Sequence, residues 1–78
     1  MTLTQMLYAV KIAETKSMNK AAAELFITQP ALSSTMRDLE EEIHTEIFIR
    51  TNKGIVITTE GEEFLSYARQ MLELNNMM

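Results

Sequence analysis

The stretch Thr28–Ile43, TQPALSSTMRDLEEEI, constrains the fold more than any other part of the chain. Its apolar residues recur at steps of four, three and four, which is the period of one face of an α-helix. Thr28 is an N-cap residue type, and Pro30 falls in the first turn, where a missing N–H is tolerated. The sequence therefore predicts one amphipathic helix with a buried stripe of Leu32, Met36, Leu39 and Ile43.

The two ends of this predicted helix differ in charge. No carboxylate occurs from Leu25 through Arg37, whereas four carboxylates crowd the segment 38–42. A helix with a positive, amide-rich N-terminal end can enter a DNA major groove, and its acidic end must then stay outside. Pro30, Ser34 and Arg37 should point away from the apolar stripe. Gln29 and Ser33 should lie near its flank.

Composition limits the chain to one small domain. With 78 residues a hydrophobic core is marginal alone, so a partner subunit would help. The hydrophobic content of 46% and the low Gly and Pro content favour a folded, largely helical chain. The absence of Cys excludes disulfides and thiolate metal sites. No apolar run approaches a membrane span and no basic-then-apolar leader opens the chain, so we expect a cytoplasmic protein that does not enter a membrane.

The net charge of −4 taken alone argues against nucleic acid, because Lys and Arg must neutralise phosphates. The distribution argues otherwise. Eight of the eleven carboxylates lie in 38–42, at Glu46, and in 60–63, and the cations lie in the segments between. This segregation predicts a modest basic patch with weak non-specific affinity. The cations concerned are Lys16, Lys20, Arg37, Arg50 and Lys53.

Two further helices are expected before Thr28. The first spans Thr2–Thr15, is capped by Thr2 or Thr4, and buries Leu3, Met6, Leu7, Val10 and Ala13. Ser17 and Asn19 are both N-cap types, and the second helix is expected at Asn19–Phe26. A short helix, a turn at Ile27–Gln29 and an amphipathic helix make a helix-turn-helix. Because helical hairpins are common, this spacing alone leaves DNA binding and an ordinary hairpin equally open.

After the long helix, the segments Glu46–Arg50 and Gly54–Thr59 are rich in β-branched residues and flank turn residues. They predict a two-stranded hairpin with Arg50 and Lys53 near its tip. Behind a helix-turn-helix such a hairpin is a wing that can lie along the DNA backbone or enter a minor groove. The alternative is a solvated hairpin whose cations only maintain solubility.

A last helix is expected from Thr59 to the C-terminus, capped by Thr58 or Thr59. It has more apolar positions than one face can hold. One set steps by four, three and four, as in a coiled-coil seam, and predicts a partner helix. The alternative is fraying at a truncated end. This proposed dimerisation set is Tyr67, Met71, Leu74 and Met78.

Two segments, NKAAAELFITQPALSSTMRDLEEEI and IFIRTNKGIVITTEG, resemble the N-terminal domain of bacterial LysR-type transcriptional regulators, and the similarity covers the whole chain. The resemblance implies a mainly α fold: a winged helix-turn-helix in residues 1–58, with a three-helix core and a two-stranded wing, then a linker and dimerisation helix in 59–78. It also implies homodimers on inverted-repeat operators and higher oligomers in full-length proteins. An effector-binding domain of about two hundred residues normally follows and is absent from this chain.

The matching positions imply roles for individual residues. Gln29, Pro30 and Ser33 would meet base edges or nearby backbone, with Gln29 able to pair with adenine through its amide. Ser33 and Ser34 are small enough to approach phosphates closely, and Arg37 could clamp a phosphate or pair with Glu40 or Glu41. The expected DNA-binding set is Ser17, Lys20, Thr28, Gln29, Pro30, Ser33, Ser34, Arg37, Arg50 and Lys53.

Three positions depart from the family pattern. Ser34 stands where the family often has a guanine-reading Arg, which should alter sequence preference. His44 stands where Gly is usual, and a left-handed backbone at this residue would destabilise the fold by about 1 kcal/mol. Asn19 replaces a Thr, and both are capping types.

Other functions have weaker support. His44 is the only histidine, so no metal site is expected, and the carboxylates of 38–42 spread around a helix instead of converging. No catalytic constellation or phosphate-binding glycine loop occurs, so we expect no cofactor and no enzyme. The rival is a small helical adaptor that binds another protein through its acidic surface and last helix. An adaptor has no reason to exclude carboxylates from Leu25 to Arg37.

Overall fold

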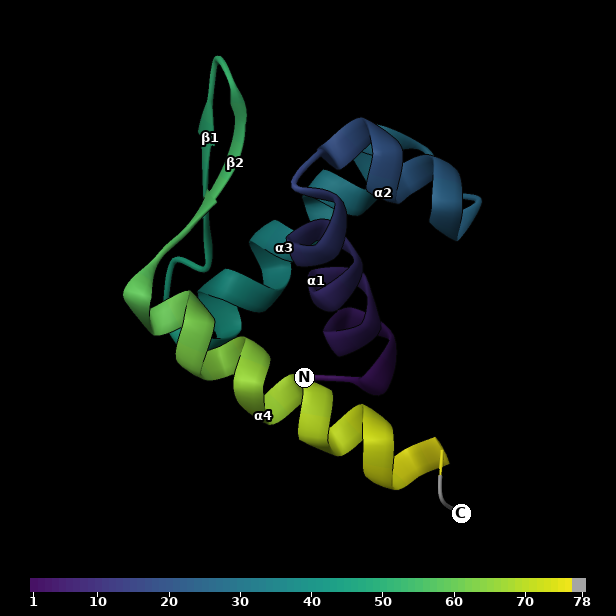
Figure 1. Cartoon of the computed structure of the whole chain (residues 1–78), viewed down its shortest axis with the longest axis vertical. Coiled ribbons are helices and arrows are strands. Elements are labelled where there is room, and N and C mark those ends of the chain that lie inside the picture. The colour runs from purple at the N-terminus through teal and green to yellow at the C-terminus, as the bar shows by residue number, and fades with distance from the viewer. Residues whose placement is uncertain (77–78) are drawn as a thin grey trace.

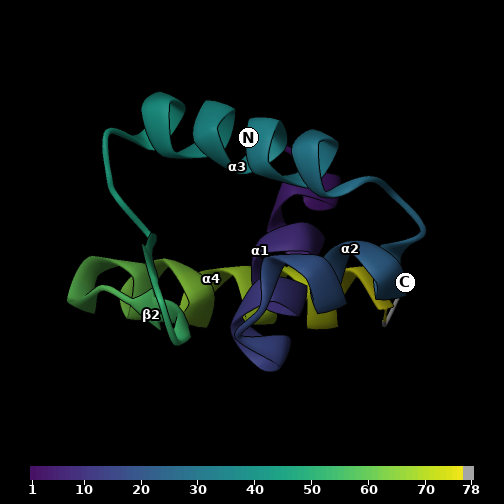
Figure 2. The ribbon, with the colours of Figure 1, turned by 90° about the horizontal axis from the view of Figure 1, so that it is seen from above.

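The computed structural model describes residues 1–76 and contains four helices and one hairpin in this part of the chain. The central helix, α1, stands between α3 on one side and α4 on the other, as Figure 2 shows from above. The wing and α2 lie at one end of the molecule and α4 crosses the other end (Figure 1). The elements are α1 Leu3–Thr15, α2 Met18–Leu25, α3 Gln29–Ile43, β1 Phe48–Thr51, β2 Gly54–Ile57 and α4 Thr59–Asn76.

Side chains cap the first three helices at their N-termini. The hydroxyls of Thr2, Ser17 and Thr28 accept hydrogen bonds from backbone N–H groups in the first turn of each helix. The cap of α1 is therefore Thr2, not Thr4. Because Ser17 is the cap of α2, this helix begins at Met18, one residue before the predicted start, and Phe26 follows its end as the C-cap.

The buried face of α1 differs from the predicted one. Met6 and Ala13 are buried as expected, but Leu3 and Leu7 are 41% and 44% exposed and Val10 is half-buried. Ala9 and Ile12 take their place and are completely buried. Because α1 packs against three other helices, its inner face needs small side chains that permit close approach, and alanine meets that need better than leucine.

The predicted stripe of α3 is confirmed. Leu32, Met36 and Leu39 are buried, and Ile43 is half-buried at the end of the helix. They pack in one core with residues from α1, α2, the wing and α4. This packing fixes which face of α3 is left for solvent.

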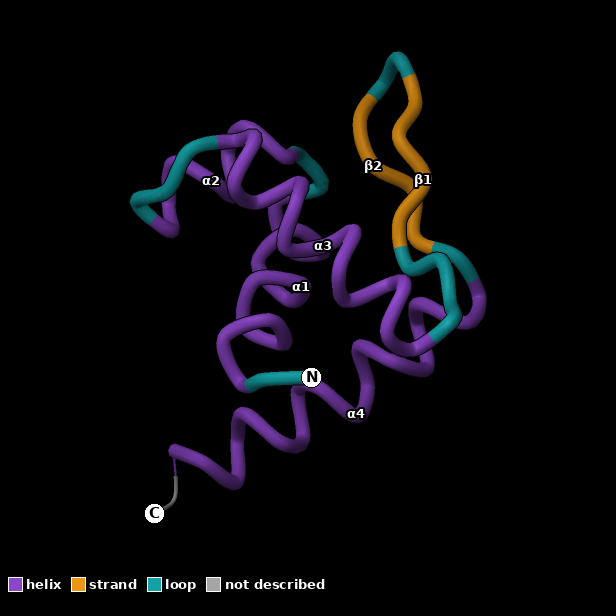
Figure 3. Tube along the Cα trace, turned by 180° about the vertical axis from the view of Figure 1, so that it is seen from behind, coloured by secondary structure: helices purple, strands orange, loops and turns teal. Residues whose placement is uncertain are grey.

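The wing is an antiparallel hairpin, with Phe48 opposite Ile57 and Thr51 opposite Gly54 (Figure 3). Both strands are shorter than predicted, since pairing begins at Phe48 and ends at Ile57. Gly54 has φ +127°, and a Cβ there would lie 3.0 Å from the carbonyl oxygen of Lys16. The N–H of Ile55 donates to the same oxygen at 3.3 Å, so the hairpin is tied to the loop between α1 and α2.

Helix α4 begins in close contact with the wing. The Thr58 hydroxyl accepts a hydrogen bond from the Gly61 N–H at 2.8 Å, so Thr58 caps the helix. Gly61, Leu65 and Ala68 are the buried residues of α4, and the helix packs against α1. No helix within residues 1–76 has the length and apolar character needed to cross a bilayer.

Candidate nucleic-acid interface

An open cleft of about 640 Å³ lies between the α1–α2 loop, the start of α3 and the tip of the wing. The wing tip and the start of α2, which line the cleft, lie at the end of the molecule opposite α4 (Figure 1). Three segments distant in sequence therefore share one surface, which we call the cleft face. Its lining residues are Thr15, Lys16, Ser17, Met18, Asn19, Lys20, Gln29, Arg50, Thr51, Asn52, Lys53, Gly54 and Ile55.

The cleft is positive throughout. Four cations line it, namely Lys16, Lys20, Arg50 and Lys53, and no Asp or Glu does. All four side chains are exposed. The ion pairs found within residues 1–76 involve only the N-terminal ammonium and Lys11, so the cleft cations are not neutralised by protein carboxylates. Clustered cations of this kind raise the local concentration of anions.

Two helix N-termini reinforce this potential. The first turns of α2 and α3 carry no acidic residue, whereas the first turn of α4 carries Glu60 and Glu62. The first turn of α2 and the first residue of α3, Gln29, line the cleft. Because the N-terminal end of a helix carries a partial positive charge, both ends favour anions such as phosphates.

Lysine 11 behaves differently from the cleft lysines. Its ammonium lies 3.2 Å from Glu24 and 3.6 Å from Glu14, so it joins α1 to α2. The hydrogen bond and the charge of Glu24 raise the pKa of Lys11. This lysine is already paired within the protein and does not line the cleft.

The predicted residues of α3 are distributed along its surface. Thr28, Pro30, Ser34 and Arg37 are exposed, and Gln29 is half-buried. The Thr28 hydroxyl also accepts a hydrogen bond from the Ala31 N–H at 3.2 Å. The alternative ion pair of Arg37 with a glutamate of its own helix is not formed in the described part of the chain.

Ser33 requires a correction. Its side chain was expected to meet base edges or the nearby backbone, but the residue is only 8% exposed. Its Oγ accepts hydrogen bonds from Gln29 Nε2 at 2.8 Å and from Arg50 Nη2. Being on the flank of the apolar stripe, it is covered when α3 packs, and its hydroxyl joins α3 to the wing.

The acidic end of α3, which was expected to stay outside a DNA groove, also has a structural role. Glu40 is half-buried, and its Oε2 accepts hydrogen bonds from the N–H groups of Ile47 and Phe48 at 2.7 and 3.1 Å. These are charge-assisted bonds. Glu40 therefore anchors the base of the wing to α3.

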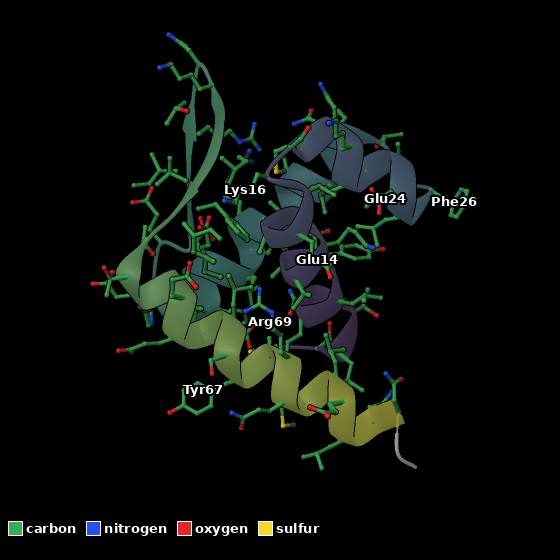
Figure 4. All side chains as sticks on the ribbon, in the orientation of Figure 1. Glu14, Lys16, Glu24, Phe26, Tyr67 and Arg69 are labelled. Carbon is green, nitrogen blue, oxygen red and sulfur yellow. The ribbon has the colours of Figure 1, made fainter. Side chains whose placement is uncertain are left out.

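Eight of the thirteen residues that line the cleft were not among the predicted site residues; Lys16 is the only cation among these eight, and Asn52 lies at the tip of the wing. Lys16 has φ 54° at the end of α1, and its carbonyl oxygen holds the Ile55 N–H. Figure 4 shows the residue between the wing and the helical body. The cation itself was visible in the sequence, but its place depends on where the wing packs. The sequence had placed Lys16 in the predicted basic patch, but not in the predicted DNA-binding set.

Within residues 1–76, no group of three His, Asp or Glu side chains lies close enough together to hold a metal ion.

A family model described as "Bacterial regulatory helix-turn-helix protein, lysR family" matches residues 3–62, which is most of the chain. The chain belongs to the LysR family. A similar curated relative is the uncharacterized HTH-type transcriptional regulator YxjO of Bacillus subtilis (strain 168), 40% identical over 65 residues. Another is the HTH-type transcriptional regulator TfdT of Cupriavidus pinatubonensis, 38% identical over 74 residues. The match covers 83% and 95% of this chain but only 22% and 32% of those two proteins.

Solved structures of LysR-family proteins have the same fold. The BenM DNA-binding domain in complex with catB site 1 DNA matches all of this chain and 88% of its own, with 36% identity and a TM-score of 0.96. CbnR, a LysR family transcriptional regulator, matches 99% of this chain and 27% of its own, with 34% identity and a TM-score of 0.94. These matches confirm the winged helix-turn-helix fold followed by a long helix.

Proposed function

We propose that this LysR-family chain binds double-stranded DNA with its cleft face and regulates transcription as part of a longer protein. The observation that carries the proposal is the cleft itself, which has two helix N-termini, no carboxylate and four cations that form no ion pair within residues 1–76. The similar BenM and CbnR DNA-binding domains were solved in complexes with DNA, which supports the assignment.

In this proposal the N-terminal half of α3 enters the major groove. Gln29 is the residue best suited to read a base, because a glutamine amide can pair with adenine through two hydrogen bonds. The exposed Pro30 and Ser34 follow it along the outer face. Ser34 lacks the guanidinium that many relatives place at this position, so we expect a weaker preference for guanine there.

Phosphate contacts would surround this helix on both sides. The loop between α1 and α2 supplies Lys16 and Ser17, and the first turn of α2 supplies Lys20. Helix α3 and its N-cap supply Arg37 and Thr28. Arg50 and Lys53 would place the wing on the backbone or in a minor groove. Asn52 joins this set at the wing tip.

We further propose that residues 1–58 form the DNA-binding unit and that residues 59–78 act as a linker that pairs in a homodimer. Tyr67, Met71 and Leu74 are 69%, 49% and 57% exposed along α4, and Figure 4 shows Tyr67 pointing away from the body. Such an apolar stripe suits a second copy of the helix. The fourth predicted member, Met78, lies outside the described residues. Sedimentation velocity of Met71→Glu against the parent chain tests this pairing, because a buried glutamate should abolish it.

The binding experiment uses fluorescence anisotropy of labelled duplex DNA across a series of salt concentrations. Affinity should fall steeply with salt, since each neutralised phosphate releases counterions. Lys16→Ala and Lys53→Ala should each weaken binding to all sequences and reduce the salt slope by about one. The matched control is Lys11→Ala, which removes a paired lysine remote from the cleft and should leave the slope unchanged.

Base reading is tested with a pool of randomised duplexes. Gln29→Ala should reduce the binding free energy by about 1–3 kcal/mol, and the lost sequence preference should be confined to one base position. Binding that is insensitive to salt and to both cleft lysines would refute the DNA proposal and favour the protein adaptor.

A further inference from the structure

The hydroxyl of Ser33 is a meeting point between two structural elements. It accepts one hydrogen bond from Gln29, one turn earlier on α3, and one from Arg50 on β1. Arg50 is seventeen residues away in sequence. Ser33 is only 8% exposed, Gln29 is half-buried and Arg50 is exposed, so this junction lies at the boundary between the core and the cleft.

The bond to Ser33 restricts the side chain of Gln29. A free glutamine has several rotatable bonds, and ordering them on binding weakens recognition. Donation of one amide hydrogen to Ser33 fixes the plane of the amide and leaves Oε1 and the second amide hydrogen for a base. An acceptor and a donor side by side are what adenine requires in the major groove.

Arg50 is suited to hold the other side of the junction. On one side Arg50 lines the cleft. On its other side it lines a small hollow together with Ser33, Met36 and Phe48. A guanidinium has five donors in a planar fork, so one can bond Ser33 while the others face a phosphate. A lysine ammonium retains the charge but lacks this fork.

We propose that Ser33 and Arg50 are positioning residues, with Arg50 holding Gln29 through the Ser33 hydroxyl, so that the wing sets the base preference of α3. The inference rests on the proposed DNA-binding function. A wing residue then has two effects, one on affinity for every sequence through its charge, and one on the choice of a single base through Gln29.

The first experiment needs no DNA. The Gln29 side-chain amide resonances of the free 78-residue chain are recorded by nuclear magnetic resonance. Ser33→Ala and Arg50→Lys should both shift these resonances and speed exchange of the amide hydrogens with water. Lys53→Ala, which changes the charge of the same wing without touching Ser33, should leave them in place. Unchanged Gln29 resonances in Arg50→Lys would overturn the inference.

The second experiment selects sequences from the randomised duplex pool. Ser33→Ala and Arg50→Lys should lower the preference at the Gln29 base by about 3- to 10-fold, while the salt slope of Arg50→Lys stays as in the parent. Lys53→Ala should weaken all sequences alike. In a Gln29→Ala background, adding Ser33→Ala should have no further effect at that base, because the group that it positions is gone.

The two failures can be told apart. A parent chain that does not bind duplexes refutes the proposed function, while the Gln29 resonances still report on the junction. A parent chain that binds selectively, with full preference retained in Ser33→Ala and Arg50→Lys, refutes the positioning inference and leaves the proposed function standing.

Discussion

Helices α1, α2 and α3 each end on a non-glycine residue in the left-handed region, and the two of these residues that lie outside the cleft are Phe26 and His44. Phe26, after α2, has φ 59° and ψ 39°, and His44, after α3, has φ 54° and ψ 40°. Both are in the left-handed region, which glycine occupies without penalty. Both side chains are exposed, Phe26 by 94%, so packing does not compensate. Figure 4 shows Phe26 pointing away from the body of the molecule. We therefore predict that Phe26→Gly and His44→Gly each stabilise the fold.

The magnitude follows from two opposing terms. A left-handed conformation costs an ordinary residue about 1–2 kcal/mol. A glycine substitution offsets part of that gain, by about 0.4–1 kcal/mol, because glycine increases the conformational entropy of the unfolded chain. The net expectation is about 0.5–1 kcal/mol for each substitution. The two sites are separated by the 15 residues of α3, about 22 Å, so their effects should add.

The assay is urea and thermal unfolding followed by circular dichroism at one fixed protein concentration, because self-association would also shift stability. A gain of 1 kcal/mol should raise Tm by about 4–8 °C for a chain of this size. Phe26→Ala and His44→Ala remove the side chain and retain the strain, so they should be less stable than the glycine variants. Ala23→Gly, inside α2, should instead destabilise. Glycine variants no more stable than the alanine variants at both positions would refute the reasoning.

Two other substitutions test how the wing is attached. Gly61→Ala should destabilise the fold by about 1–3 kcal/mol in urea unfolding, because the new Cβ would lie 2.5 Å from the backbone oxygen of Ile47. Glu40→Gln should weaken two charge-assisted hydrogen bonds to the base of the wing. It should therefore destabilise the fold by about 1 kcal/mol and speed amide hydrogen exchange in β1. Glu41→Gln, at an exposed residue of the same helix, should have neither effect. Equal exchange in both glutamine variants would contradict the role of Glu40.

The sequence predicted α3 well because its pattern is local and repeated. The apolar step of four, three and four, the hydroxyl of Thr28 and the position of Pro30 all indicate the same helix in the same register. The structure confirms this stripe and cap. Charge segregation likewise predicted a basic surface around the start of this helix, because side chains with no apolar partner stay on the surface.

The face of α1 could not be chosen in the same way. Two overlapping apolar stripes run along it, one with Leu3 and Leu7 and one with Ala9 and Ile12. Hydrophobicity favours the leucines, whereas the closeness of the neighbouring helices favours alanine. That closeness is a property of the packed molecule, and no local pattern encodes it.

The remaining differences at the site have one origin, namely contacts between residues far apart in sequence. Ser33 joins α3 to the wing because Arg50 reaches it from β1, and Glu40 is an anchor because β1 begins beside it. Lys16 faces the cleft because Ile55 binds its carbonyl oxygen. Each depends on how the hairpin docks, which hydrophobic periodicity does not specify.

The central claim is that DNA meets the cleft face, and nuclear magnetic resonance titration of the labelled chain with a duplex tests it most directly. The account predicts that amide shifts concentrate in residues 16–20, 28–37 and 50–53 and weaken as salt is raised. Shifts that concentrate instead on the acidic start of α4, in residues 60–63, with the cleft amides unmoved, would contradict it.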